Sequence, residues 1–261
     1  AADLRHAAAF GRRKVRIAAG SVEESRGSDV VVITASIGLP GPAPDRMDFA
    51  HGNLAIAKQW VPSLASASPD AVFVVVSNPV DVMTYVVGRL AALPTRQIIG
   101  TGTLIDSGRW RSLLSDHLQI HPDDVRAYIL GEHGETQFPA LSVAVTGGQR
   151  LDSGSVHRTL FEQARQAGID VYRRKGYTNF AIGQATTLII ETILRDSRRT
   201  LPVSVLLDDY FGVSDVCLSV PVIIGRRGVL RHLRPQLDAA EIELLQASGR
   251  HVRAVIDTLS I

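Results

Sequence analysis

Three runs of β-branched apolar residues alternate with helix-length segments in the first hundred residues, and this alternation strongly constrains the fold. The runs occupy residues 29–34, 71–76 and 97–99, and residues 14–17 form a shorter run of the same kind. Continuous apolar runs are typical of parallel strands that are buried on both faces. The segment between the first two long runs has a helical apolar face, formed by Leu54, Ala57, Val61 and Leu64. The pattern predicts a doubly wound α/β sheet.

The second part of the chain follows a different pattern. A short apolar run covers residues 125–130, and a long helix is expected over residues 156–174. Strand-like runs then occupy residues 203–206 and 216–220. The last helix opens at Asp238, three residues before a Glu, which is an Asp-led variant of the capping box. Strands and helices mixed in this order indicate an α+β unit.

Length and composition limit the class of protein. The 261 residues suffice for two domains, which we place at residues 1–100 and 101–261. A net charge of +2 is too small to favour nucleic acid or a membrane surface as partner. A single cysteine, Cys217, excludes an intrachain disulfide framework and fits a reducing compartment. We therefore expect a cytoplasmic protein without a membrane span, and we expect no metal site.

A glycine-flanked histidine follows the run at residues 125–130. Residues 131–135 read Gly-Glu-His-Gly-Glu, with His133 at the centre. The glycines allow a sharp turn and close approach by other groups. A histidine at the end of a buried strand is well placed for proton transfer near neutral pH. The alternative is a structural histidine that caps the strand, and this motif alone does not exclude it.

Two charged residues upstream of the histidine share a helix face. Asp106 and Arg109 are spaced i, i+3, so their side chains are neighbours on the helix surface. One interpretation is a surface ion pair that contributes little stability. The other is a site in which Asp106 accepts a hydrogen bond from a histidine ring and Arg109 binds a carboxylate.

Four blocks in a fixed order carry a resemblance to a known family. The blocks are residues 76–81, 101–111, 131–135 and 175–183. Together they resemble the L-lactate/malate dehydrogenase family, and its lactate branch more closely, over nearly the whole chain. The resemblance implies an incomplete Rossmann-type parallel sheet, lacking the N-terminal part of the cofactor domain, followed by an α+β substrate domain.

The resemblance implies an oxidoreductase that transfers a hydride between NAD and a small 2-hydroxy or 2-oxo acid, of the L-lactate dehydrogenase type. In the family the matching histidine exchanges a proton with the substrate, which gives His133 this role. Asp106 then orients His133, and Arg109 grips the substrate carboxylate. Arg46, at the end of a Gly/Pro-rich loop, polarises the reacting carbonyl as the loop closes, unless it is only a solvated arginine at a helix start.

Further residues match family positions that line the bound molecules. Asn78 and Thr178 match positions that contact the substrate. For Thr178 and Ile182, ordinary roles as a helix-start and a core residue are nearly as well supported by the sequence. The positions implied for the cofactor lie mainly at strand ends, where open α/β sheets bind ligands. They are Thr34, Ala35, Val76, Asn78 and Ile182.

Two departures from the family pattern leave alternatives open. The loop lacks the Gln or Arg that separates lactate from dicarboxylate enzymes, and Leu39 falls at or near that position. A malate or branched-chain L-2-hydroxy acid dehydrogenase therefore remains an alternative. The chain as written also lacks the glycine-rich dinucleotide fingerprint. We expect it to be truncated, to bind NAD weakly or not at all, to expose a sheet edge and to be poorly soluble. A non-catalytic assembly or binding subunit is the other alternative.

The resemblance also bears on assembly and regulation. It implies a cytoplasmic enzyme of glycolysis that forms a homo-oligomer, either a dimer or a homotetramer. Arg111 and Arg126 match positions that line a fructose 1,6-bisphosphate site in some bacterial lactate dehydrogenases. The family commonly has His at the second position, so Arg126 is a departure. Two solvent-exposed arginines in an arginine-rich chain are the alternative.

Overall fold

A six-stranded mixed sheet forms the centre of the molecule. The computed structural model describes residues 1–11, 14–38, 46–151 and 154–261, without the side chains of residues 46–48. The strand order is β1-β2-β3-β9-β10-β11. Strands β1, β2 and β3 are parallel, whereas β9, β10 and β11 are antiparallel to their neighbours. The bounds are β1 Val30–Ile33, β2 Val72–Val75, β3 Ile98–Gly100, β9 Arg199–Leu207, β10 Val216–Gly225 and β11 Gly228–His232.

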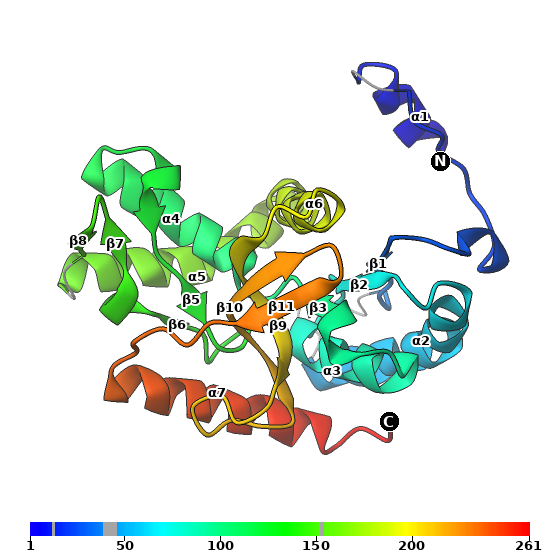
Figure 1. The fold of residues 1–261 in the computed structure, drawn as a ribbon. Coiled ribbons are helices and arrows are strands. Elements are labelled where there is room, and N and C mark those ends of the chain that lie inside the picture. Colours follow the sequence, from blue (N-terminus) through cyan, green and yellow to red (C-terminus); the bar gives the residue numbers. More distant parts are fainter. Residues whose placement is uncertain (12–13, 39–45, 152–153) are drawn as a thin grey trace.

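Helices connect and cover these strands (Figure 1). The α-helices are α1 Ala2–Ala8, α2 Arg46–Ala67, α3 Val80–Ala91, α4 Leu104–Leu118, α5 Ser155–Lys175, α6 Phe180–Leu194 and α7 Ala239–Ile256. Short 3₁₀ turns cover Glu23–Ser25, Thr95–Gln97, Pro122–Asp124 and Leu141–Val143. Two small antiparallel sheets, β4-β7-β8 and β5-β6, complete the fold. Their strands are β4 Val125–Arg126, β5 Ile129–Leu130, β6 Phe138–Pro139, β7 Val145–Thr146 and β8 Gln149–Arg150.

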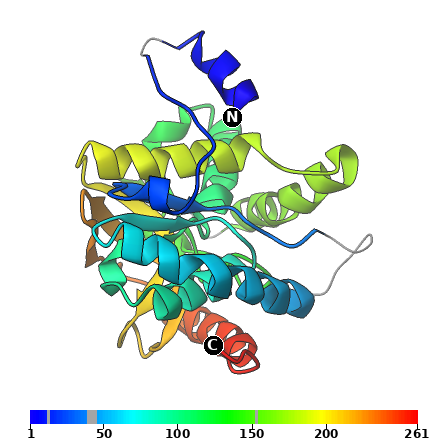
Figure 2. The same cartoon turned by 90° about the vertical axis from the view of Figure 1, so that its right-hand side faces the viewer.

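The central sheet lies between two helical layers. Figure 2 shows α6 on one side and α2 with α3 on the other, and α7 packs against β10 and α3. The α/β class expected from the alternating runs is confirmed. The predicted apolar face of α2 is also confirmed, because Leu54, Ala57 and Val61 are buried in the main core. Among the described helices, none is long and apolar enough to cross a bilayer.

The start of the chain differs from the prediction in two ways. Residues 14–17 were expected as a strand, but they belong to no sheet, and only Ile17 of the four is partly buried. Strand β1 was expected to be buried on both faces, yet Val32 is 36% exposed. Strand β1 is the outermost strand of the sheet, and its outer edge has no ladder partner in the described part of the chain, in line with the expected exposed edge. Helix α1 stands away from the body and buries no residue (Figure 1).

The run at residues 125–130 forms two strands rather than one. Strand β4 pairs with β7, whereas β5 pairs with β6, so the two halves join different sheets. Between the strands, the Tyr128 carbonyl accepts a hydrogen bond from the Ala140 backbone N–H at 2.9 Å. Strand β5 still leads directly to His133, as the prediction required.

The capping box predicted at the last helix is present. The Asp238 side chain accepts a hydrogen bond from the Glu241 backbone N–H at 2.9 Å, and the Glu241 side chain accepts from the Asp238 backbone N–H. Glu241 also accepts a hydrogen bond from the Ser142 backbone N–H at 2.9 Å. The beginning of α7 is therefore tied both to its own cap and to the segment after β6.

This geometry predicts unequal losses of stability at the cap. Asp238→Ala should lower the free energy of unfolding by about 1 kcal/mol, the usual effect of losing an N-cap. Glu241→Ala should lower it further, because it also leaves the Ser142 N–H unpaired. Urea unfolding measures both, with the exposed Glu243→Ala on the same helix as control. Equal losses for Glu241→Ala and Glu243→Ala would contradict this account.

Candidate active site

The loop after β5 places His133 at a fixed point. Gly131 exchanges two backbone hydrogen bonds with Ser219 of β10, at 3.0 and 2.9 Å. Its φ of +89° lies in the left-handed region, and a Cβ there would lie 2.9 Å from the Ser248 hydroxyl oxygen. Glycine is therefore required at this turn by both backbone conformation and space. His133, the candidate acid–base residue, lies two residues after this anchored glycine.

Asp106 joins the two cationic candidates. Its Oδ2 atom lies 2.5 Å from Nδ1 of His133, and its Oδ1 atom accepts a hydrogen bond from Arg109 Nη1 at 2.9 Å. The Asp106 side chain is 1% exposed, whereas His133 retains 26% exposure. Each carboxylate oxygen thus serves one partner. The ion pair expected from the spacing exists, but Asp106 is buried rather than at the surface, and it also bonds the histidine.

The charges in this cluster shift the pKa values in opposite directions. Burial lowers the pKa of His133, but the neighbouring Asp106 carboxylate outweighs burial and raises this pKa above its ordinary value. Burial raises the pKa of Asp106, but His133 and Arg109 outweigh it and lower this pKa. The arrangement favours an imidazolium paired with a carboxylate. Because Nδ1 is used by Asp106, Nε2 is the ring atom left to exchange a proton.

A second buried carboxyl group, Asp81, holds the histidine backbone. Its Oδ2 atom accepts the His133 backbone N–H at 2.7 Å. The Ser204 hydroxyl and the His133 backbone N–H both favour the charged form of this carboxyl group. Burial raises the pKa of Asp81 to about 6. The sequence analysis placed Asp81 in a family block but assigned it no role.

A glycine on α5 shapes the surroundings of Arg109. A Cβ at Gly168 would lie 3.1 Å from Arg109 Nη1 and 3.4 Å from Cζ, so the guanidinium rests directly against the α5 backbone. Any larger residue there would displace the group expected to grip the substrate carboxylate. Gly168 was not predicted, because no local sequence signal distinguishes it from other helical glycines.

The cofactor candidates lie at the carboxyl ends of β1 and β2. The Val76 N–H donates to the Ile33 carbonyl at 2.9 Å, and the Ser77 hydroxyl donates to the Ala35 carbonyl at 2.6 Å. The Asn78 carbonyl accepts from the Asn53 side chain at 2.6 Å. Thr34, Ala35 and Asn78 are exposed there. This edge offers backbone and amide groups suited to hydrogen bonds with a nicotinamide and its ribose, so the donor set fits that half of NAD.

The remaining candidates lie on or next to helices α6 and α2. Ile182 is half-buried on α6, and Thr178 is exposed just before that helix. Among the described residues, neither these two nor Asn78 forms a hydrogen bond or ion pair with His133, Asp106 or Arg109. Arg46 begins α2, but its side chain lies outside the described residues, as does Leu39.

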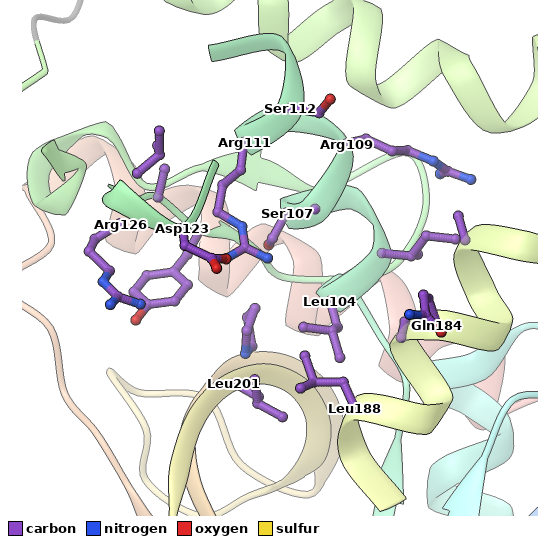
Figure 3. Close-up of a pocket in the computed structure, with 18 of the residues that line it drawn as sticks. Leu104, Ser107, Arg109, Arg111, Ser112, Asp123, Arg126, Gln184, Leu188 and Leu201 are labelled. Atoms are coloured by element: carbon purple, nitrogen blue, oxygen red, sulfur yellow. The ribbon is translucent and has the colours of Figure 1, made fainter. Parts of the chain in front are cut away.

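Arg111 and Arg126 line the same cavity, which has a volume of about 1130 Å³ (Figure 3). Arg199 also lines it, and Asp123 lies beside Arg111. Burial lowers the pKa of the Arg111 guanidinium, and its Nε atom has no partner in the described part of the chain. The cavity also reaches Arg109 at its other end.

A metal role finds no support in the side chains that the structure describes. Within residues 1–11, 14–38, 46–151 and 154–261, no group of three or more His, Cys, Asp or Glu side chains is arranged to hold a metal ion.

Comparison with known proteins identifies the family. The family model for the NAD binding domain of lactate/malate dehydrogenase matches residues 1–100, and the model for the alpha/beta C-terminal domain of the same family matches residues 103–260. An L-lactate dehydrogenase from Synechococcus sp. (strain JA-3-3Ab) is 40% identical over 98% of this chain and 85% of its own length. L-lactate dehydrogenase A from Hordeum vulgare is 39% identical over 99% of this chain and 74% of its own length.

Solved structures agree in fold. The crystal structure of minor L-lactate dehydrogenase from Enterococcus mundtii superposes with a TM-score of 0.93 at 31% identity, covering 100% of this chain and 85% of that chain. A lactate dehydrogenase from a Medee basin deep-sea metagenome library gives the same TM-score and identity, covering 100% of this chain and 86% of that chain. Sequence and fold agree over the whole chain, and this protein belongs to the lactate/malate dehydrogenase family.

Proposed function

We propose that this protein is an NAD-dependent L-lactate dehydrogenase, interconverting a small L-2-hydroxy acid and its 2-oxo acid. The observation that carries the proposal is the bond between His133 Nδ1 and Asp106 Oδ2 at 2.5 Å. It supports an imidazole that is oriented, charged and partly exposed, as an acid–base group near neutral pH requires. NAD supplies the hydride acceptor in one direction and, when reduced, the hydride donor in the other.

Three side chains carry out proton transfer, orientation of the histidine and binding of the substrate carboxylate. In the direction of 2-oxo acid reduction, His133 donates the Nε2 proton to the carbonyl oxygen of the substrate, and the imidazole is left neutral. Asp106 keeps Nδ1 protonated and stabilises the imidazolium before transfer. Arg109 binds the substrate carboxylate with its planar guanidinium, which suits two parallel hydrogen bonds.

Further groups complete the proposed site. Arg46 polarises the carbonyl when its loop closes and excludes water. Asn78 and Thr178 contact the substrate. We assign the nicotinamide end of NAD to the edge formed by Thr34, Ala35, Val76, Asn78 and Ile182, on the support of the exposed strand ends described above.

The larger organisation belongs to the proposal as well. We divide the chain into a partial dinucleotide-binding domain, residues 1–100, and a catalytic domain, residues 101–261. We place the enzyme in the cytoplasm, in glycolysis, on the support of its single buried cysteine and its family. Exposed apolar side chains on α5 and α6, such as Ile169, Val171 and Phe180, support a homo-oligomer, either a dimer or a tetramer.

Replacing the acid–base partner tests the proposed chemistry. Asp106→Asn should lower kcat for pyruvate reduction by roughly 100-fold or more, since general acid–base groups contribute at this level. The Kd for NADH should barely change, because Asp106 does not lie at the cofactor edge. Glu135→Gln, an exposed carboxylate in the histidine loop, is the matched control. An unchanged turnover in Asp106→Asn would refute the assignment.

The same variant should change the dependence on pH. With Asp106 present, the pKa of His133 is raised, so the protonated ring needed for reduction persists to higher pH. In Asp106→Asn this support is lost, and the rate of reduction should start to fall at lower pH. The pH profile of kcat/KM for pyruvate and the NMR titration of the His133 ring both measure the shift.

Substrate preference follows from the loop sequence. Residues 35–45 contain no Gln, Arg or Lys, so they lack a side chain to bind a second carboxylate. Ile37, which lies in this loop and is half-buried, packs against Gly52 of α2. We therefore expect a higher specificity constant for pyruvate or 2-oxoisocaproate than for oxaloacetate. A higher value for oxaloacetate would favour the malate-type alternative instead.

The arginine-lined cavity supports regulation by fructose 1,6-bisphosphate. The half-buried Arg111 guanidinium, with its unpaired Nε atom, can form charge-assisted hydrogen bonds with a phosphate. We expect the bisphosphate to raise activity or promote assembly, and Arg111→Gln or Arg126→Gln to abolish this response. Arg96→Gln, an exposed arginine outside this cavity, serves as the control. If the titration changes neither activity nor assembly state, the two arginines have no effector role.

A further inference from the structure

Three polar side chains connect the C-terminal helix to the residue before the catalytic histidine. The Glu132 backbone N–H donates to the Ser248 hydroxyl oxygen at 2.7 Å. The Ser248 and Thr136 hydroxyl oxygens lie 2.8 Å apart, and the Thr136 hydroxyl donates to Glu132 Oε2 at 2.6 Å. Ser248 is fully buried on α7, and Glu132 is 5% exposed. These contacts close a hydrogen-bonded ring through Glu132, Ser248 and Thr136.

The direction of each hydrogen bond in the ring follows from the available donors. A carboxylate only accepts, so the Thr136 proton is directed at Glu132. Thr136 has no second hydroxyl proton, and Ser248 must therefore donate to the Thr136 oxygen. The Ser248 oxygen remains free to accept the Glu132 N–H. All three bonds point the same way around the ring, an arrangement in which each bond polarises and strengthens the next.

The ring completes a set of anchors around His133. Gly131 is bound to Ser219 of β10, and the His133 N–H is bound to Asp81 of α3. Glu132 lies between these two residues and is the one bound to α7, through Ser248. Three successive backbone N–H groups are thus held by three different elements. Helix α7 is itself attached at its beginning, where Glu241 accepts from Ser142, so it is a firm support.

We propose that Ser248, Thr136 and Glu132 are positioning residues for the dehydrogenase reaction, through which α7 holds the His133 ring against Asp106. The Nδ1–Oδ2 distance of 2.5 Å leaves little tolerance for movement of the loop. Without the ring, the peptide before His133 loses its attachment to α7, and the imidazole shifts relative to both Asp106 and the substrate. The kinetic part of this proposal rests on the function proposed above, whereas its structural part does not.

A pair of substitutions at Thr136 separates positioning from bulk. Thr136→Val keeps the shape but removes the hydroxyl, which breaks the ring at two bonds. It should lower kcat for pyruvate reduction about 10-fold or more, since small displacements of catalytic groups have effects of this order. KM for NADH should stay unchanged. Thr136→Ser keeps the hydroxyl and should recover kcat to within about twofold of the wild type, because the ring can reform.

Two further variants complete the design. Ser248→Ala should lower kcat in the same way, because it removes the acceptor for the Glu132 N–H. Thr258→Val, at an exposed site just beyond α7, is the matched control and should not change kcat. If Ser248→Ala does not fold, the Thr136 pair still decides the question. Equal kcat values for wild type, Thr136→Val and Thr136→Ser would overturn the proposal, and so would equal losses in both Thr136 variants.

A readout without turnover keeps this test independent of the proposed function. In ¹⁵N-labelled protein, the His133 Nδ1 proton should resonate far downfield, as expected for a short hydrogen bond to Asp106. Thr136→Val should move this signal upfield and speed amide exchange at Glu132, while Thr136→Ser should restore both. Unchanged signals in Thr136→Val would show that the ring does not position His133. A wild type with this signal but no dehydrogenase activity would refute the proposed function and leave the positioning role standing.

Discussion

The active-site arrangement depends on one buried carboxylate, Asp106, shared between two cations. It bonds the ring of His133 and the guanidinium of Arg109 with separate oxygens. Its helix, α4, is held in place by Trp110 and Leu114, which are fully buried in a second apolar cluster with residues of α5 and β4. Packing of that cluster therefore sets the distance between the carboxylate and the histidine. A large-to-small substitution in this cluster would leave a cavity, and the position of Asp106 would become less well defined although no polar group is changed.

The antiparallel strands connect this helix to the histidine loop. Ser219 of β10 exchanges backbone hydrogen bonds with Gly131, and its hydroxyl accepts the Thr103 backbone N–H at 2.9 Å, one residue before α4. A single residue of the sheet thus holds the start of the Asp106 helix and the start of the His133 loop. The parallel strands carry the edge proposed for the cofactor, whereas the antiparallel strands set the positions of Asp106 and His133.

Much of this could be predicted from the sequence because its signals are local. β-Branched runs, the apolar face of α2 and the Asp238 capping box each depend on residues a few positions apart. The contacts of Asp81 and Ser248 with the histidine loop span 52 and 116 residues, so no local pattern encodes them. The family resemblance supplied the His133–Asp106 pair, but it carried no reason to single out Gly168. The half-exposed β1 was mispredicted because burial of a strand depends on its neighbours rather than on its own residues.

Burial of the Asp81 carboxyl group lowers the free energy of unfolding. Its pKa of about 6 exceeds the ordinary 3.8, so the folded state disfavours its charged form. Between these values the native protein binds more protons than the unfolded chain, and stability therefore falls as pH rises. Above pH 6 the penalty is constant, at about 3 kcal/mol for a shift of this size. The Ser204 hydroxyl and the His133 N–H favour the charged form of Asp81, but burial outweighs them. The same carboxyl group accepts the His133 N–H at 2.7 Å, so the group that lowers stability also fixes the backbone of the histidine loop.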